Sequence, residues 1–130
     1  MKFLSYGYIN ASTSPSETVF PIGMLTDHLE LYLDFISDVV FHPRFDAAKV
    51  EQERQRVLRE TADAKSSHVF PEKMDFFEAL YGKDSPFNHF TLGKEEVVAK
   101  ASPSDLRIFH QRGYNPNNMD LVLVGKLPEN

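Results

Sequence analysis

Two carboxylates with a regular spacing are the side chains best placed to do chemistry. Glu53 and Glu60 are seven residues apart in the stretch DAAKVEQERQRVLRETADAK, which contains no Gly or Pro and is rich in helix-forming residues. At about 100° per residue, positions seven apart lie within about 20° of each other, two turns apart along a helix. The two carboxylates therefore share one face. They lie at the edge of the apolar sector formed by Val50, Val57 and Ala64.

This position leaves two interpretations of the carboxylates. Carboxylates at such an edge are either half-exposed or held by a cation. In the half-exposed case they form a solvated border, in which Glu53 can pair with Arg56 or with Lys49 along the helix. Helix geometry alone favours the solvated border, because helices rich in Glu and Arg are common.

The other reactive side chains form no recognisable site. No pair of histidines has a metal-site spacing such as H-x-x-x-H, and the sequence contains neither a G-x-S-x-G nucleophile elbow nor a phosphate-binding glycine pattern. Without Cys, thiolate metal sites, catalytic thiols and disulfides are excluded. We expect each histidine to be structural or on the surface. The five are His28, His42, His68, His89 and His110.

Residues 1–25 are expected to form a strand and hairpin region. The segments Tyr8–Ser12 and Thr18–Leu25 are rich in β-branched and aromatic residues, and they flank the solvated turn STSPSE at 12–17. This pattern predicts a β-hairpin.

Residues 26–66 are expected to form two long helices. Thr26 is the predicted N-cap of the first helix, in which apolar residues recur at helical spacing as far as His42. Asp46 then opens the second helix, which is predicted to end near Lys65 and carries both carboxylates.

Residues 70–113 are expected to hold further helices and a loop. Pro71 in the first turn and Gly82 just past the end bracket one helix, and Lys94–Ala101 form a short one after the loop. Ser102-Pro103-Ser104-Asp105 resembles a capping box that starts another helix, ending near Gly113.

The last element expected is a closing strand at 118–125. Met119–Gly125, MDLVLVG, is a continuous apolar run that suits a buried strand.

Composition excludes several classes of protein. The chain has 130 residues, 42% of them hydrophobic and 25% charged, which is typical of a soluble globular chain of one domain or less. A formal net charge of −5 offers nucleic acid no evident binding surface. Neither a signal-peptide core nor an apolar run of about 18 residues, as a membrane span needs, is visible. The 11 Phe, with no Trp, indicate either a dense core or surfaces that meet another segment.

Three motifs, taken in order, resemble the insulinase (pitrilysin) family of zinc metallopeptidases. They are N-A-x-T in GYINASTSPSETVF, P-x-F followed by E-R-x-x-V-L-R-E, and Y-x-P-x-N-M followed by an apolar run and Gly. The resemblance covers nearly the whole chain. It implies an α+β fold with an antiparallel-rich sheet and helices packed on one face, of which residues 1–130 form a single partial domain, an incomplete processing-peptidase-like half-domain.

The resemblance also implies roles for four residues. The family's zinc site is the inverted motif H-x-x-E-H, with two His ligands, a water-activating Glu and a third ligand from a downstream Glu. By this match Glu60 is the downstream zinc ligand, and Glu53 is an accessory carboxylate that orients a ligating His or water. Asn10 and Ala11 match the exposed edge strand to which a substrate peptide is added as a further strand.

No H-x-x-E-H motif occurs in the sequence. A family spacing of roughly 75 residues to the downstream Glu would place it before Met1. Phe3 to Tyr6 would then be the last turn of the helix before the N-A strand, with Gly7 as its C-terminal cap. A catalytic zinc needs three protein ligands, so we expect no catalytic residue in this chain and weak or no zinc binding by it at neutral pH.

Two functions from different classes follow. The chain is either a portion of a zinc metalloendopeptidase whose upstream part supplies the missing groups, or a non-catalytic structural or chamber-forming subunit of the same fold. The complete enzyme would act on a peptide substrate. Exposed apolar surface would favour self-association or a second homologous half-domain as partner. The sequence implies no nucleic-acid partner and no membrane span, and it does not identify a compartment.

Overall fold

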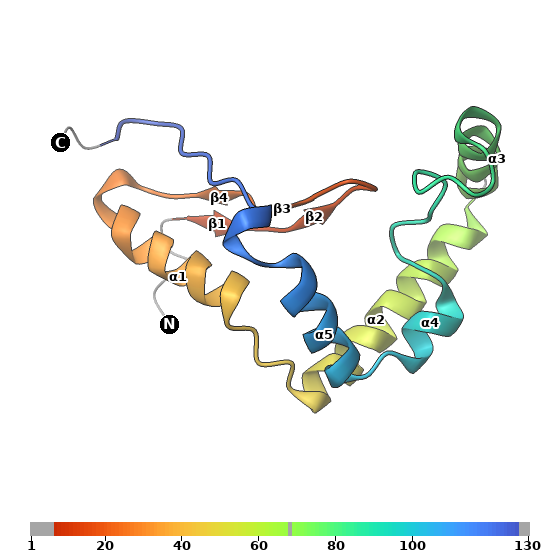
Figure 1. Cartoon of the computed structure of the whole chain (residues 1–130), viewed down its shortest axis with the longest axis horizontal. Coiled ribbons are helices and arrows are strands. Elements are labelled where there is room, and N and C mark those ends of the chain that lie inside the picture. Colours follow the sequence, from red (N-terminus) through yellow and green to blue (C-terminus); the bar gives the residue numbers. More distant parts are fainter. Residues whose placement is uncertain (1–6, 68, 128–130) are drawn as a thin grey trace. The chain divides into compact units, whose positions relative to one another are not determined.

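The computed structural model describes residues 7–67 and 69–127. The chain is α+β, with short antiparallel strands near its start and helices after them (Figure 1). In chain order the elements are β1 (Tyr8–Ile9), β2 (Ser12–Thr13), β3 (Thr18–Val19), β4 (Ile22–Gly23), the 3-10 helix η2 (Thr26–His28), α1 (Leu29–Phe41), α2 (Ala47–Ser66), α3 (Val69–Tyr81), α4 (Glu95–Lys100), α5 (Pro103–Gly113) and the 3-10 helix η3 (Pro116–Asn118). The last turn of helix expected at Phe3 to Tyr6 lies outside the described residues.

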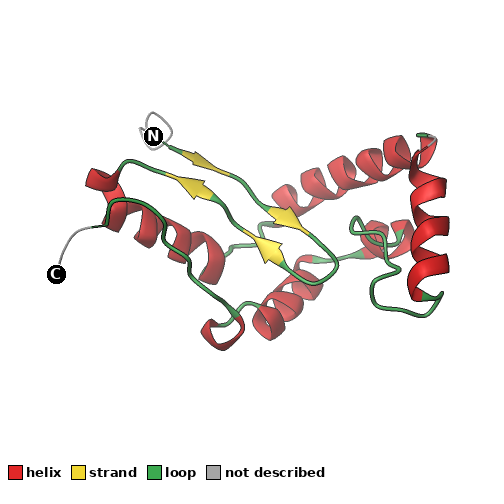
Figure 2. Ribbon diagram, turned by 90° about the horizontal axis from the view of Figure 1, so that it is seen from above, coloured by secondary structure: helices red, strands yellow, loops and turns green. Residues whose placement is uncertain are grey.

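The four strands form the expected hairpin. β1 pairs antiparallel with β4, with Tyr8 opposite Gly23, and β2 pairs with β3. Figure 2 shows the two pairs following one another along the hairpin. Between them the Asn10 amide donates to the Pro21 carbonyl at 3.1 Å, but Pro21 has no N–H to return the bond. The ladder is therefore divided into two short pieces.

Two compact units make up the chain. The first contains the described parts of 1–12, 19–44 and 107–130, and the second contains 13–18 and 45–106. Site residues expected from the sequence fall in both: Asn10 and Ala11 belong to the first unit, and Glu53 and Glu60 belong to the second.

In the first unit, α1 lies beside the β1–β4 pair (Figure 1). Its buried residues are Tyr32 and Val40. The Tyr32 hydroxyl lies so close to Gly7 that a Cβ built on Gly7 would be 2.6 Å from it. No larger residue fits at Gly7 without movement of the tyrosine, and this close contact fixes where α1 meets the start of β1.

The N-cap predicted for this helix was wrong. Thr26 opens the short 3-10 turn η2 rather than capping α1, and α1 follows from Leu29 with His28 at its N-cap and no side-chain cap bond. The apolar periodicity predicted the helix correctly. The helix begins later than expected because the chain first forms a 3-10 turn after β4. In this turn the His28 amide donates to the Leu25 carbonyl at 3.0 Å.

The second unit is built around α2, which begins as expected. The Asp46 carboxylate accepts hydrogen bonds from the amides of Ala48 and Lys49 at 3.1 and 3.3 Å, so it satisfies two of the four unpaired N–H groups at the helix start.

One face of α2 packs on α4. Thr61 on that face is only 1% exposed, and its hydroxyl donates to the Val57 carbonyl at 2.9 Å. Two cations link the helices: the Arg54 guanidinium donates to the Ala101 carbonyl just after α4, and Lys65 pairs with Glu95 at 2.8 Å. These contacts determine which side of α2 remains in solvent.

The other expected helices form where the sequence predicts them. Gly82 follows α3 in the left-handed conformation, with φ of 86°, and its amide donates to the Glu78 carbonyl at 2.8 Å. At the start of α5 the Asp105 amide donates to Ser102 Oγ at 3.2 Å, and the Ser102 amide donates to Asp105 Oδ2 at 2.9 Å. The capping box predicted there is confirmed.

The closing strand predicted at 118–125 is not formed. Met119 has extended backbone angles, φ −142° and ψ 143°, but no strand of the described residues pairs with the segment that follows. Its apolar side chains stay in solvent, and Val124 is 93% exposed. An apolar run supplies the propensity for a strand, but the backbone also needs a neighbouring strand as hydrogen-bond partner.

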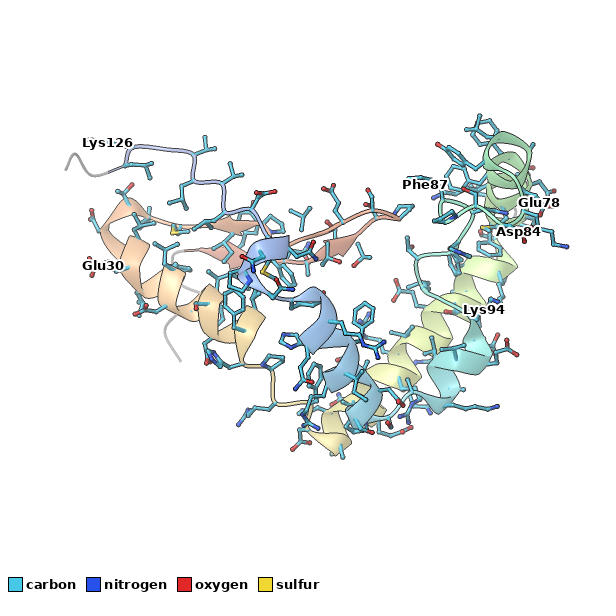
Figure 3. The ribbon with its side chains drawn as sticks, viewed as in Figure 1. Glu30, Glu78, Asp84, Phe87, Lys94 and Lys126 are labelled. Carbon is cyan, nitrogen blue, oxygen red and sulfur yellow. The ribbon has the colours of Figure 1, made fainter. Side chains whose placement is uncertain are left out.

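Much other apolar surface is exposed in the described residues. Large exposed side chains lie on α3 and on α5, among them Val69, Phe76, Leu80, Ile108 and Phe109. Figure 3 labels Phe87 beside α3, where its ring lies 5.5 Å from that of Tyr81. Aromatic side chains thus lie next to one another at the surface of α3, and of the described aromatic residues only Tyr32 is buried.

Candidate functional site

The two carboxylates singled out by spacing are joined by one cation. Arg56 Nε donates to Glu53 Oε2 at 2.7 Å, and Arg56 Nη1 donates to Glu60 Oε2 at 3.2 Å. The side chains of Glu53 and Glu60 are 60% and 51% exposed. We call these three residues the α2 acid stripe. The stripe is open to solvent, and its two carboxylates are close enough for a single guanidinium to span.

Packing of α2 places this stripe outward. Arg54 and Thr61, which face α4, each follow a glutamate of the stripe by one residue, so they lie about 100° around the helix from it. The Arg54 side chain is only 18% exposed, and it also pairs with Glu51. Because α4 covers the Arg54 side, Glu53 and Glu60 remain accessible to a ligand or to another protein segment.

Of the two cations that the sequence offered to Glu53, Arg56 is the one used. Lys49 Nζ instead donates to Gln52 Oε1 at 3.3 Å. Sequence reasoning missed that Arg56 serves both carboxylates at once. The spacing could have predicted this double contact. Arg56 is three residues after Glu53 and four before Glu60, and residues three or four apart are neighbours on a helix.

Arg56 is held in its charged form by its neighbours. The hydrogen bond that Arg56 donates to Glu53, followed by the negative charge of that residue, raises the pKa of Arg56 above its ordinary value, and Glu60 adds to the effect. The guanidinium is fully protonated at any physiological pH, so the stripe carries two negative charges and one positive charge.

The donors of the stripe suit part of a metal site. An exposed glutamate oxygen is a ligand for Zn²⁺, and a second carboxylate nearby can hold a ligating group in place. Within 7–67 and 69–127, no group of three or more His, Cys, Asp or Glu side chains lies together as a metal site requires. Glu60 and Glu53 therefore fit the roles of one ligand and its support, and further ligands would have to come from elsewhere.

His110 and His42 make contacts with residues of their own unit. His110 Nε2 lies 2.7 Å from the Val40 carbonyl, and the His110 ring stacks on Tyr114 with centroids 4.9 Å apart. His42 Nδ1 lies 3.6 Å from Asp38 on the surface at the end of α1. These contacts agree with the structural or surface roles expected for histidines. His68 lies outside the described residues.

The predicted substrate strand carries an open edge. In this antiparallel register the Asn10 amide faces Pro21, so the N–H and C=O groups of Ile9 and Ala11 point away from β4. No described strand pairs with β1 on that side. The Ala11 amide donates instead to Asn10 Oδ1 at 2.9 Å. Asn10 thus occupies the donor that an added strand would use.

A shallow hollow of about 600 Å³ is a separate feature of the second unit. Phe70 and Phe90 form part of its wall, with an edge-to-face contact between centroids 4.5 Å apart. The Lys65–Glu95 ion pair lies at its rim. Lys65 projects from the α4 side of α2, so the hollow does not include the α2 acid stripe.

Comparison with known proteins identifies the relationship. The family model described as "Insulinase (Peptidase family M16)" matches residues 5–84. The chloroplastic stromal processing peptidase of Oryza sativa subsp. japonica is 32% identical over 127 residues, which are 92% of this chain and 10% of that protein. The same enzyme of Pisum sativum is 31% identical over 124 residues, 91% of this chain and 10% of that protein.

A bacterial relative is matched over a similar part of the chain. A protein of Mycobacterium leprae named as an uncharacterized zinc protease is 32% identical over 121 residues, which are 93% of this chain and 27% of that protein. The chain thus spans a small part of the length of these relatives. Among the described residues, no helix combines the length and apolar character needed to cross a membrane. The match of the family model over more than half of the residues shows that the chain belongs to the insulinase family of peptidases.

Proposed function

We propose that this chain is a portion of a zinc-dependent metalloendopeptidase and that it supplies Glu60 as the downstream zinc ligand. Glu53 would support a ligating group, and the strand at Asn10 and Ala11 would receive the substrate peptide. The chain is not catalytically competent alone, because a catalytic zinc needs three protein ligands and an open position.

The exposed α2 acid stripe is the observation that carries this proposal. Two carboxylates lie close together on the exposed side of α2, where they remain accessible to histidines from another segment. Family membership and a relative named as a zinc protease are the further support. A zinc ion held there would polarise the scissile carbonyl and generate a nucleophilic water at neutral pH.

Substrate binding in this proposal uses backbone groups of the open β1 edge. An extended peptide can form main-chain hydrogen bonds with the outward groups of Ile9 and Ala11, as in other cases of β-strand addition. Binding at Ala11 requires the Asn10 carboxamide to release the amide that it now accepts from. The side chain of Asn10 would then be free to contact the peptide.

The test is peptide cleavage by the whole protein that contains this chain. Glu60→Gln should abolish turnover, and Glu72→Gln, which removes an exposed carboxylate of α3, should leave it unchanged. The coding sequence upstream of Met1 should contain H-x-x-E-H. Full activity in Glu60→Gln would refute the assigned ligand. An upstream sequence without the motif, in an inactive protein, would favour the non-catalytic chamber-forming subunit.

A further inference from the structure

The feature that the proposed site does not explain is the cation at its centre. Arg56 contacts both carboxylates through different nitrogen atoms, at 2.7 Å to Glu53 and 3.2 Å to Glu60. Its side chain is 61% exposed, about as much as theirs, so the described residues do not cover it. Of the two contacts, the one to Glu60 is the longer.

A metal ion and a guanidinium use the same lone pairs. Carboxylate oxygens accept N–H donors along the directions in which they also bind metal ions. Arg56 donates to Oε2 of Glu60, and it brings a positive charge to the carboxylate that would have to bind a doubly charged ion. Binding of the ion is therefore opposed by competition for the oxygen and by charge repulsion.

We propose that Arg56 is a positioning residue that holds the Glu60 carboxylate in the absence of metal and is displaced from it when zinc binds. This inference rests on the proposed function, in which Glu60 is the ligand. Metal binding is then an exchange of cations: Arg56 leaves Glu60 and keeps its shorter contact to Glu53. The arginine lowers zinc affinity, and it prevents two like charges from standing unpaired in the metal-free protein.

If Arg56 only stabilised the helix, a different result would be expected. An exposed ion pair between helical neighbours adds a little to helix stability, and its loss would leave zinc affinity unchanged or reduced. If Arg56 instead competes with zinc for Glu60, removal of Arg56 should make zinc bind more tightly. Competition also predicts that the gain shrinks as salt rises, because salt screens repulsion between exposed charges.

The experiment measures zinc affinity of the whole protein by competition with a chromophoric chelator, with zinc alone as the probe. Arg56→Gln should bind zinc about tenfold more tightly than the unmodified protein at low salt. Arg59→Gln removes the same charge from the same helix, at a position about 100° from Glu60 and about 120° from Glu53, and should change affinity less than about twofold. Far-UV circular dichroism of each variant checks that α2 remains folded.

Three results would count against the inference. If Arg56→Gln binds zinc as well as, or less well than, the unmodified protein, Arg56 does not compete. If Arg59→Gln gains as much as Arg56→Gln, overall charge and not the contact to Glu60 is responsible. Glu60→Gln distinguishes failure of the proposed function from failure of this inference. If zinc affinity is unchanged in Glu60→Gln, Glu60 is not a zinc ligand and both proposals are refuted. If Glu60→Gln loses affinity but Arg56→Gln has no effect, only the inference about Arg56 is refuted.

Discussion

The amide of Ala11 shows how a single side chain can control access to a strand edge. It is an outward-facing donor on the open side of the hairpin, and the Asn10 carboxamide accepts from it at 2.9 Å. In the proposed function, an added peptide strand and the Asn10 side chain would therefore compete for one hydrogen bond.

Replacing Asn10 should expose this amide. In Asn10→Ala we expect amide hydrogen exchange at Ala11 to become about fivefold faster after correction for local sequence, because one exposed hydrogen bond is lost. Two-dimensional NMR measures the rate. Asn117→Ala, which replaces an exposed asparagine within η3, is the matched control. An unchanged rate at Ala11 would mean that the hydrogen bond does not protect the amide in solution.

The sequence could predict which residues share a surface better than it could predict what they contact. Helical spacing placed Glu53 and Glu60 on one face, and the structure has them bridged by one guanidinium. Spacing alone could not choose between Arg56 and Lys49 as the cation, because both lie within helical reach of Glu53. That choice depends on side-chain rotamers and on Gln52, which engages Lys49.

Helix α5 has a start that depends on pH. The hydrogen bond from the Ser102 side chain, followed by that from its amide, holds the pKa of Asp105 below its ordinary value. Because the folded pKa lies below the unfolded one, this carboxylate stabilises the helix start fully above about pH 3.9, and the contribution is lost as pH falls through the folded pKa.

Removing the serine hydroxyl should return this pKa toward its ordinary value. In Ser102→Ala we expect the Asp105 titration, followed by NMR of its side-chain carbonyl carbon, to shift upward, and α5 to fray at its first turn. Ser37→Ala, an exposed position on α1, should leave the titration where it was. An Asp105 pKa that does not respond to Ser102→Ala would show that the capping box does not persist in solution.

Local sequence signals predicted the helices well because the backbone hydrogen bonds of a helix form within the helix itself. The Asp46 cap, the glycine after α3 and the capping box of α5 are all encoded within a few residues. The prediction of a closing strand was wrong because a strand, unlike a helix, needs a hydrogen-bond partner from another part of the chain. Residues 119–125 have the composition of a buried strand, but the backbone partner of a strand lies elsewhere in the sequence, and the described residues do not provide one.

The chain as a whole leaves unusually many apolar side chains in solvent. Of the large apolar side chains in the described residues, only Tyr32 and Val40 are buried, whereas Phe76 and Phe109 are well exposed. Exposed apolar area of this kind is typical of surfaces that meet another segment or another molecule. None of the described Phe side chains is fully buried, so they lie at surfaces that another segment or molecule could cover.

We expect the isolated 130-residue chain to self-associate. Burial of exposed aromatic and aliphatic side chains between copies should make its sedimentation coefficient rise with concentration in the micromolar range. Analytical ultracentrifugation measures this. A chain that sediments as a monomer at every concentration, and also unfolds in one cooperative transition, would indicate that the exposed side chains need no partner.

Zinc affinity of the whole protein is the most direct test of the role proposed for this chain. If Glu60 is a ligand, Glu60→Gln should weaken zinc binding by more than about a hundredfold, and Glu53→Gln, which removes a supporting carboxylate, by about tenfold to a hundredfold. Equilibrium competition with a chelator gives both values. Zinc binding that is unaffected by Glu60→Gln would contradict the account.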